Sequence, residues 1–384
     1  MVDTHNTKKL YTQLDIACKE LKKAKNSDER VALVNYIGNL NAAIATMEDE
    51  KIIFDKGRIY GSHKNQKKFL KKLDIYEDRM LDSFVLNKDF HSNYMGEVLS
   101  GIEDNMAEIP EEKISPTTML KESDFYDIFY QFMKSIKLDK LFDKFIEEKK
   151  IYSTITPFSE GNLGFTLYNP VNKDIDIFVN DFEYNIHSMF TLAHEFGHAY
   201  DLNNFNEDIS VYNKYFYRSF YGEVISKTFE RLFLDYMLKN KILLKESQDK
   251  LFESEMINHS YILGSYMLSL LPDSLLHDGS YANLDKDKFI TMIKNNFIDE
   301  DSIRKFIYES VAFDLIEDFT YAYGDIISMF IHESVRDCGF SNDLVEEFLR
   351  LRSNLFDEEF MRRWGMGPEN YVKLHKKEIE CLKK

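Results

Sequence analysis

Residues that break regular structure are scarce in this chain, whose 384 residues include only 6 prolines and 15 glycines. All-β domains join short strands by frequent turns that need these residues, whereas long helices do not. Charged residues make up 30% of the chain and hydrophobic residues 44%, a balance that favours long helices. The sequence therefore predicts a mainly α-helical protein.

Net charge and cysteine content limit the classes of partner and the compartment. The formal charge of −17 predicts repulsion from nucleic-acid phosphates and from anionic membranes, so we expect neither as a partner. The three cysteines, Cys18, Cys338 and Cys381, form no CxxC pair, which predicts neither a disulfide framework nor a thiolate metal site. The first thirty residues are polar and no run of eighteen apolar residues occurs, so a cytoplasmic location is expected.

A predicted β-hairpin separates two stretches of helical periodicity along the chain. Apolar residues recur every three or four positions from about residue 4 to 150, and we predict an N-terminal helical region over 1–150. Alternating apolar residues at 163–167 and 175–179, on either side of a polar turn, then predict a β-hairpin. Helical patterning resumes near His187, so residues 151–384 are predicted to form the second region, which carries the chemistry described next.

The strongest chemical signal is the HExxH pattern at His194, Glu195 and His198. Positions i and i+4 of a helix share a face, so the two imidazoles can bind one Zn²⁺ while Glu195 reaches a metal-bound water. Zinc lowers the pKa of such a water towards about 7, and a glutamate can then act as general base and acid. The competing interpretation is a pair of helix histidines used only for packing or hydrogen bonding.

A catalytic zinc site needs a third protein ligand, which we predict to be Glu223. The metzincin extension of HExxH is absent, since Asp201 and Asn204 replace its glycine and histidine. Glu223 lies on the polar stripe of an amphipathic segment at 222–233, which also carries Glu230 seven positions later. That stripe can face the histidine helix across a cleft. Taken without the histidines, Glu223 would be an ordinary solvated helix residue.

The chain resembles the oligopeptidase F and thimet oligopeptidase group of zinc metallopeptidases over roughly residues 160–375. Five segments carry the resemblance: TLAHEFGHAYD at 191–201, GEVISKTFERLFLDYML at 222–238, IDIFVND at 175–181, FTYAYG at 319–324 and EEFLRLRSNLFDEEFMRRWGMGPENY at 346–371. The resemblance implies two helical halves flanking a substrate cleft, with a small β-hairpin just before the HExxH helix. It also implies that the 175–181 strand is an edge strand that pairs with the substrate backbone.

The chain departs from this group at the residues that stabilise the transition state. The group's histidine and tyrosine for this role would fall near Val311 and Glu317, neither of which can donate the required hydrogen bond. Tyr321 and Tyr323, and the more distant Tyr308, are the expected substitutes as donors to the oxyanion. The group's motif also continues to a histidine where this chain has an aspartate, Asp201, which we expect to orient a metal-binding imidazole.

We therefore expect a zinc metalloendopeptidase, an oligopeptidase that binds one Zn²⁺ per chain and hydrolyses short unstructured peptides. The first alternative is a catalytically weak or inactive helical zinc protein that binds peptides or a protein partner, which the missing histidine and tyrosine would explain. The second is a different zinc hydrolase built on the same helix. The sequence predicts no oligomeric state.

Overall fold

The structure is a computed structural model of the chain. It describes residues 4–24, 29–30, 32–34, 36–37, 40, 88–106, 117–153, 163–169, 174–179, 182–204, 222–269, 315–336, 361–362 and 364–381.

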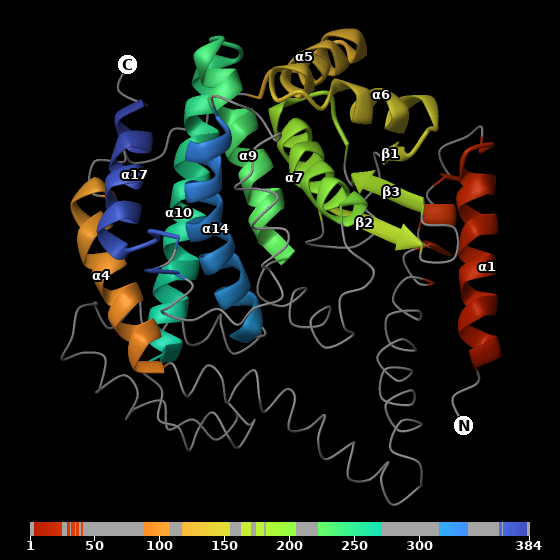
Figure 1. Ribbon diagram of the computed structural model, residues 1–384. Helices are drawn as coiled ribbons and strands as arrows, with labels where there is room; N and C mark the ends of the chain where they lie inside the picture. The colour runs from red at the N-terminus through yellow and green to blue at the C-terminus, as the bar shows by residue number, and fades with distance from the viewer. Residues whose placement is uncertain are drawn as a thin grey trace, which may run out of the picture.

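The described residues form a mainly helical molecule with one small sheet, as predicted (Figure 1). None of these helices combines the length and the hydrophobicity that crossing a bilayer requires. In chain order the elements are α1 (Thr4–Leu21), α4 (Lys88–Met106), α5 (Glu122–Ser135), α6 (Asp139–Glu147), β1 (Ile151–Ser153), β2 (Gly164–Asn169), β3 (Asp174–Val179), α7 (Ile186–Asn203), α9 (Gly222–Lys239), α10 (Leu244–Ser269), α14 (Leu315–Val335) and α17 (Pro368–Cys381).

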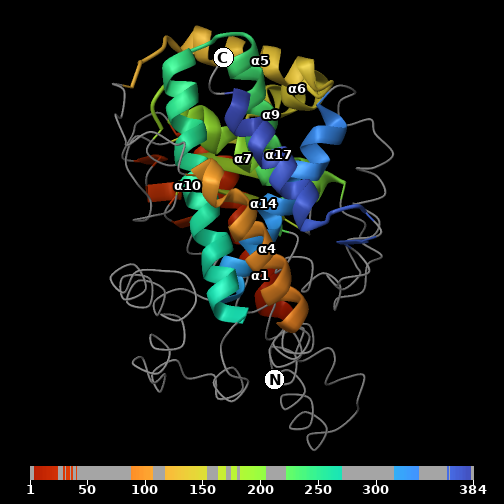
Figure 2. The ribbon, with the colours of Figure 1, turned by 90° about the vertical axis from the view of Figure 1, so that its left-hand side faces the viewer.

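The long helices stand side by side and lead to the sheet (Figure 1). Helix α9 packs between α7 and α14. Helix α10 packs against α14 and α4, and α4 also contacts α17. Helix α7 lies against β2 and β3, so it connects the helical layer to the sheet. Helices α5 and α6 lie together at one end of the molecule in both side views (Figures 1 and 2). The HExxH helix is therefore the central element of the described structure.

The sheet has the strand order β1-β3-β2, with β3 in the middle. Strand β3 is parallel to β1, with Ile151 opposite Ile177, and antiparallel to β2, with Thr166 opposite Ile177. The predicted hairpin is confirmed. The expectation that residues 175–181 form an edge strand is wrong, because β1 occupies the side of β3 that β2 leaves. Among the described strands, β1 and β2 are the edges.

Both faces of β3 are buried, although an alternating sequence usually has one exposed face. A helix covers each face. Ile175, Ile177 and Val179 point to the main hydrophobic core together with α7. Phe178 points the other way, into a second core that α1 completes together with Val34, Ile37 and Leu40. It stacks between Tyr152 and Phe165, with ring centroids 4.9 and 4.5 Å away. Helix α1 thus covers the face of the sheet that α7 does not.

The main core crosses the predicted boundary at residue 150. It joins Phe125, Phe129 and Phe132 of α5 to Phe196 of α7 and Phe233 of α9. The Phe132 and Phe233 rings meet edge to face with centroids 5.1 Å apart. The division into regions 1–150 and 151–384 stays a prediction, but α5 belongs to the same core as the HExxH helix.

A buried group of charges ties α9 to the C-terminal helices. Arg231 of α9 forms ion pairs with Asp325 of α14, at 2.5 Å, and with Glu378 of α17. The Tyr371 hydroxyl of α17 donates a hydrogen bond to the other oxygen of Asp325, at 3.0 Å. Burying an unpaired charge costs free energy, so these partners offset the cost of burying the Arg231 guanidinium. They hold α9 at the position on which the site depends.

Candidate metal centre

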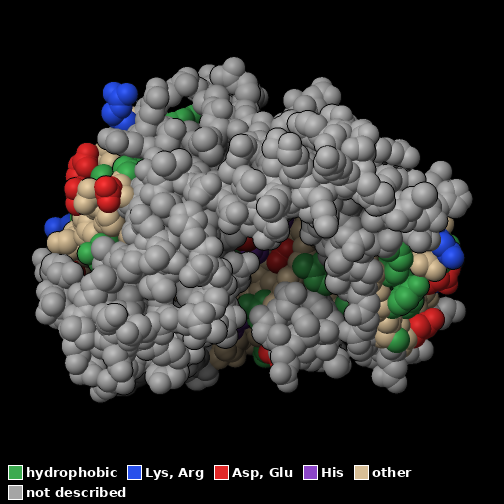
Figure 3. Space-filling model, turned by 90° about the horizontal axis from the view of Figure 1, so that it is seen from below, with side chains coloured by type: hydrophobic (Ala, Val, Ile, Leu, Met, Phe, Trp, Pro, Cys, Tyr) green, Lys and Arg blue, Asp and Glu red, His purple; other side chains and the backbone are tan. Residues whose placement is uncertain are grey.

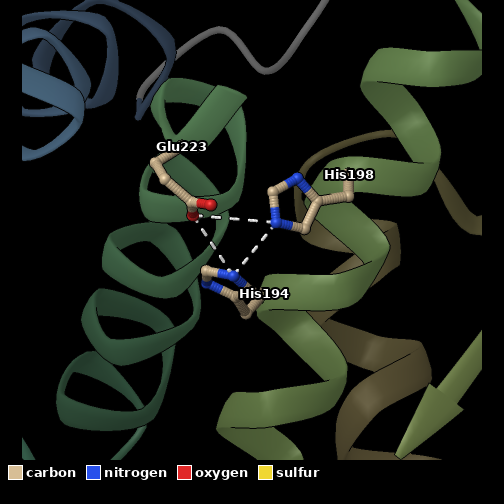
Figure 4. Close-up of side chains that lie close together, drawn as sticks. All are labelled: His194, His198 and Glu223. Atoms are coloured by element: carbon tan, nitrogen blue, oxygen red, sulfur yellow. Dashed lines mark hydrogen bonds and ion pairs between the residues drawn. The ribbon is translucent and has the colours of Figure 1, made fainter. Parts of the chain in front are cut away.

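Helix α7 presents His194 and His198 on one face, as their i, i+4 spacing predicts. The helix begins at Ile186, and the side chain of its N-cap, Asn185, accepts a hydrogen bond from the Ser188 backbone N–H at 3.1 Å. The Nε2 atoms of the two histidines lie 3.1 Å apart (Figure 4). Both imidazoles therefore direct the same nitrogen to one point.

Helix α9 brings Glu223 to the same point (Figure 4). The Glu223 Oε2 atom lies 3.3 Å from His194 Nε2 and 3.7 Å from His198 Nε2. The same oxygen accepts a hydrogen bond from the Ser226 hydroxyl at 2.9 Å, which fixes the carboxylate. The predicted third ligand thus lies beside the two histidines, although residues 205–221 separate the helices along the chain.

The three side chains fit a metal ion. Two atoms that bind the same tetrahedral Zn²⁺ at about 2.0–2.1 Å are about 3.3 Å apart. The observed separations of 3.1, 3.3 and 3.7 Å lie around this value. The side chains of His194, His198 and Glu223 are 18, 23 and 15% exposed, so a fourth ligand can still reach the ion. In the view from below, the hollow at the middle of the molecule exposes histidine and acidic side chains (Figure 3).

Glu230 orients His194, a role that the sequence did not predict. Its Oε1 atom lies 2.5 Å from His194 Nδ1, the ring nitrogen that does not face the other two side chains. A metal-binding imidazole commonly donates its second N–H to a carboxylate in this way. The signal in the sequence was the seven-residue spacing from Glu223, which places both carboxylates on one stripe of α9. Glu223 lies beside His194 Nε2 and Glu230 beside His194 Nδ1.

Lys227 balances the charge of Glu230. Its ammonium lies 3.7 Å from Glu230 Oε2 and donates a hydrogen bond to Asn258 Oδ1 at 3.2 Å. Burial by itself would raise the pKa of Glu230, but Lys227 and His194 together lower that pKa to about 2. Glu230 is therefore ionised at neutral pH and can hold the His194 N–H.

The centre favours positive charge. Burial by itself would lower the pKa of His194, but the hydrogen bond to Glu230 and the charges of Glu230 and Glu223 raise it to about 9. Without a metal, His194 thus carries a proton that compensates for the two carboxylates. A divalent cation would displace that proton, because both cannot occupy Nε2.

Removing Glu223 and removing Glu230 should change zinc binding to different extents. We expect Glu223→Ala to lose bound zinc, because it removes a ligand, and Glu230→Ala to keep zinc with an affinity about 10–100-fold lower. Metal analysis and zinc titration of the purified variants measure both effects, with Glu253→Ala on the exposed face of α10 as control. If Glu230→Ala loses zinc and Glu223→Ala retains it, the ligand assignment is wrong.

Glu195 directly follows His194 and lies against the sheet. Its side chain is buried, and the residue is 5% exposed. The Thr166 hydroxyl of β2 lies 2.8 Å from Glu195 Oε2 and 2.8 Å from the Glu195 backbone oxygen. Gly164, also on β2, is so close that an added Cβ would be 2.9 Å from Glu195 Oε1. Strand β2 therefore forms one wall around the predicted general base.

Two glycines allow the helices around Glu223 to approach closely. A Cβ on Gly197 of α7 would lie 2.6 Å from the Ser226 Cα and 3.0 Å from the Ile225 oxygen of α9. A Cβ on Gly324 of α14 would lie 2.8 Å from the Glu223 Cβ. Both distances are shorter than real Cβ contacts, so glycine is required at both positions. The first turn of α9 is held between them.

The two predicted tyrosines occupy different environments. Tyr323 is fully buried, and its hydroxyl lies 2.5 Å from His91 Nδ1 of α4. An oxyanion donor must face the metal, so this placement argues against that role for Tyr323. Tyr321 is half-buried and stacks on Tyr261, with ring centroids 4.7 Å apart, and the Lys227 ammonium lies 5.7 Å from its ring. Tyr321 thus stays a candidate.

Tyr308, Val311 and the side chain of Glu317 lie outside the described residues, as does most of the 346–371 segment. Asp201 is described and is 4% exposed on α7. Its expected role in orienting His198 stays a prediction.

Comparisons with known proteins find one distant structural likeness. No protein-family model matches the chain, and no curated protein matches it. Among solved structures, the chain is similar to a Bacillus anthracis str. Ames protein that is provisionally named an oligoendopeptidase F. The two are 17% identical with a TM-score of 0.47, and the match covers 93% of this chain. This chain spans 66% of the length of that protein.

Proposed function

We propose that this protein is a zinc-dependent metalloendopeptidase that hydrolyses short unstructured peptides. The observation that supports it most is the convergence of His194 Nε2, His198 Nε2 and Glu223 Oε2 within 3.7 Å of one another, beside a glutamate that directly follows His194. Two imidazole nitrogens and one carboxylate oxygen form a donor set that suits catalytic Zn²⁺, one ion per chain.

The residues around the centre have separable tasks in this reaction. A zinc ion bound there would lower the pKa of a water towards about 7 and polarise the scissile carbonyl. Glu195 would accept the proton of the attacking water at its carboxylate and pass it to the leaving amine. Glu230 would hold the proton of His194 on Nδ1, which leaves Nε2 free to act as a ligand. Lys227 would keep Glu230 ionised for this task.

Strand β2 is the proposed site for the substrate backbone, in place of the 175–181 strand. Its outer edge pairs with no other strand in the described part of the chain. An extended peptide can add to such an edge through main-chain hydrogen bonds, with little preference for its side chains. A peptide bound there would lie near Glu195, because Gly164 and Thr166 both adjoin that side chain.

A protein that binds zinc and peptides without turnover is the second candidate. The burial of the Tyr323 hydroxyl against His91 favours it, because one predicted oxyanion donor is then lost. Tyr321 is the remaining described candidate for that hydrogen bond. We place either protein in the cytoplasm. Its charge of −17 argues against nucleic acid and anionic membranes as partners.

Metal dependence distinguishes these functions. We expect the purified protein to cleave peptides in a mixed pool, a zinc chelator to abolish cleavage, and added zinc to restore it. Mass spectrometry should show products with new amino and carboxyl termini, while a folded control protein stays intact. Zinc-loaded protein that binds the peptides and leaves them intact would support the second candidate. Products other than those of peptide-bond hydrolysis would indicate a different zinc hydrolase.

A further inference from the structure

The two carboxylate oxygens of Glu195 have different neighbours on β2. Oε2 accepts a hydrogen bond from the Thr166 hydroxyl at 2.8 Å. Oε1 lies on the side of Gly164, where an added Cβ would be only 2.9 Å from it. A hydroxyl therefore occupies one oxygen, whereas the residue beside the other oxygen has no side chain. Both partners come from one strand, two positions apart.

We propose that Thr166 is a positioning residue for Glu195, and that Oε1 is the oxygen that accepts the proton from water. This inference rests on the proposed peptidase function. A carboxylate side chain has three rotatable bonds, and a hydrogen bond to Oε2 restricts the last of them. Thr166 thereby keeps Oε1 directed to one place. Gly164 has no Cβ, and a Cβ there would crowd Oε1 at 2.9 Å, so glycine keeps this side of the carboxylate free of a side chain.

The Thr166 hydroxyl also ties the carboxylate to the helix backbone. It lies 2.8 Å from the Glu195 backbone oxygen as well as 2.8 Å from Oε2, and its single proton serves one of them at a time. The Thr166 hydroxyl thus holds the Glu195 carboxylate close to the Glu195 backbone oxygen. Since β2 is also the edge proposed to bind the substrate, Thr166 links the position of the peptide to that of the general base.

Thr166→Val tests this role, because valine has nearly the same shape and lacks the hydroxyl. We expect kcat to fall about 10–100-fold, because general-base catalysis depends on placing the proton acceptor within hydrogen-bond reach. KM and bound zinc should change less than twofold, because the metal ligands are untouched. Thr166→Ser keeps the hydroxyl and should recover kcat to within about threefold of the wild-type value.

Thr191→Val is the matched control on α7, since the Thr191 hydroxyl donates only to the backbone oxygen of His187, at 3.2 Å. Its kcat should equal that of the wild-type protein. If Thr166→Val does not fold, Thr166→Ala removes the same hydroxyl with less crowding. Unchanged kcat in a zinc-loaded variant without the hydroxyl, or a loss that serine does not restore, would overturn the proposal.

Crystal structures of the metal-free variants provide a readout that does not need activity. In Thr166→Val the Glu195 carboxylate should leave its place beside Gly164, whereas in Thr166→Ser it should keep it. A carboxylate that stays in place in the valine variant refutes the positioning role. If the wild-type protein cleaves no peptide, the proposed function fails, and these structures still decide whether Thr166 positions Glu195.

Discussion

Glu195→Gln is expected to retain one zinc ion per chain and to lower kcat for peptide cleavage about 10²–10⁴-fold. Glutamine has the shape of glutamate, so its amide oxygen can still accept the hydrogen bond that Thr166 donates to Oε2. The proposed metal ligands His194 and His198 should keep their positions. The amide cannot take a proton from water, however, so only the proton transfer is lost.

Peptide turnover and metal content of the same preparation measure this effect. Glu183→Gln is the control, because Glu183 lies just before α7 and its Oε2 accepts a hydrogen bond from the Asn185 side chain at 2.9 Å. It should cleave peptides at the wild-type rate. Undiminished turnover by Glu195→Gln with zinc bound would contradict the peptidase mechanism. Loss of zinc from that variant would show instead that Glu195 supports the metal.

Gly197→Ala is expected to have the largest effect on the architecture of the centre. Its methyl group would lie 2.6 Å from the Ser226 Cα and 3.0 Å from backbone atoms of α9, none of which can rotate away. Helices α7 and α9 must then separate, which moves Glu223 away from the two histidines. We expect zinc affinity to fall about 10–100-fold, as when the support of a ligand is lost, and stability to fall by about 1–3 kcal/mol.

The sign of the stability change makes this test decisive. Alanine in place of glycine within an open helix stabilises it by about 1 kcal/mol, so a loss can come only from the contact with α9. Gly222→Ala is the matched control, since a Cβ there meets no atom of the described residues within 4 Å. Thermal unfolding of the metal-free proteins and zinc titration measure the two effects. Wild-type zinc affinity in Gly197→Ala would show that the close approach of the helices is unnecessary.

The sequence was most informative where chemistry depends on local spacing. His194 and His198 lie one helical turn apart, so any helix places them together. Glu223 was predicted from its place on an amphipathic stripe, and the structure places it beside them. The hairpin followed from strict alternation on both sides of a turn.

Tertiary contacts were beyond the reach of these patterns. Thr166 and Glu195 are separated by 29 positions, and Tyr323 and His91 by 232 positions, so no periodicity connects either pair. The wrong expectation for the 175–181 strand came from the family resemblance. In this chain β1, which precedes the hairpin, pairs in parallel with β3 and so removes its free edge. The sequence placed Glu230 on the same stripe as Glu223, but its contact with His194 Nδ1 depends on how α9 packs against α7.

The packing of α9 between Gly197 and Gly324 has a consequence for how the protein matures. Glu223 is synthesised before Gly324, and the two lie side by side in the folded chain. A Cβ on Gly324 would be 2.8 Å from the Glu223 Cβ. The surroundings of Glu223 therefore include α14, a helix that is synthesised later in the chain. If the centre binds zinc as proposed, we expect zinc uptake to follow the folding of the C-terminal part of the chain, because α14 packs against the base of Glu223.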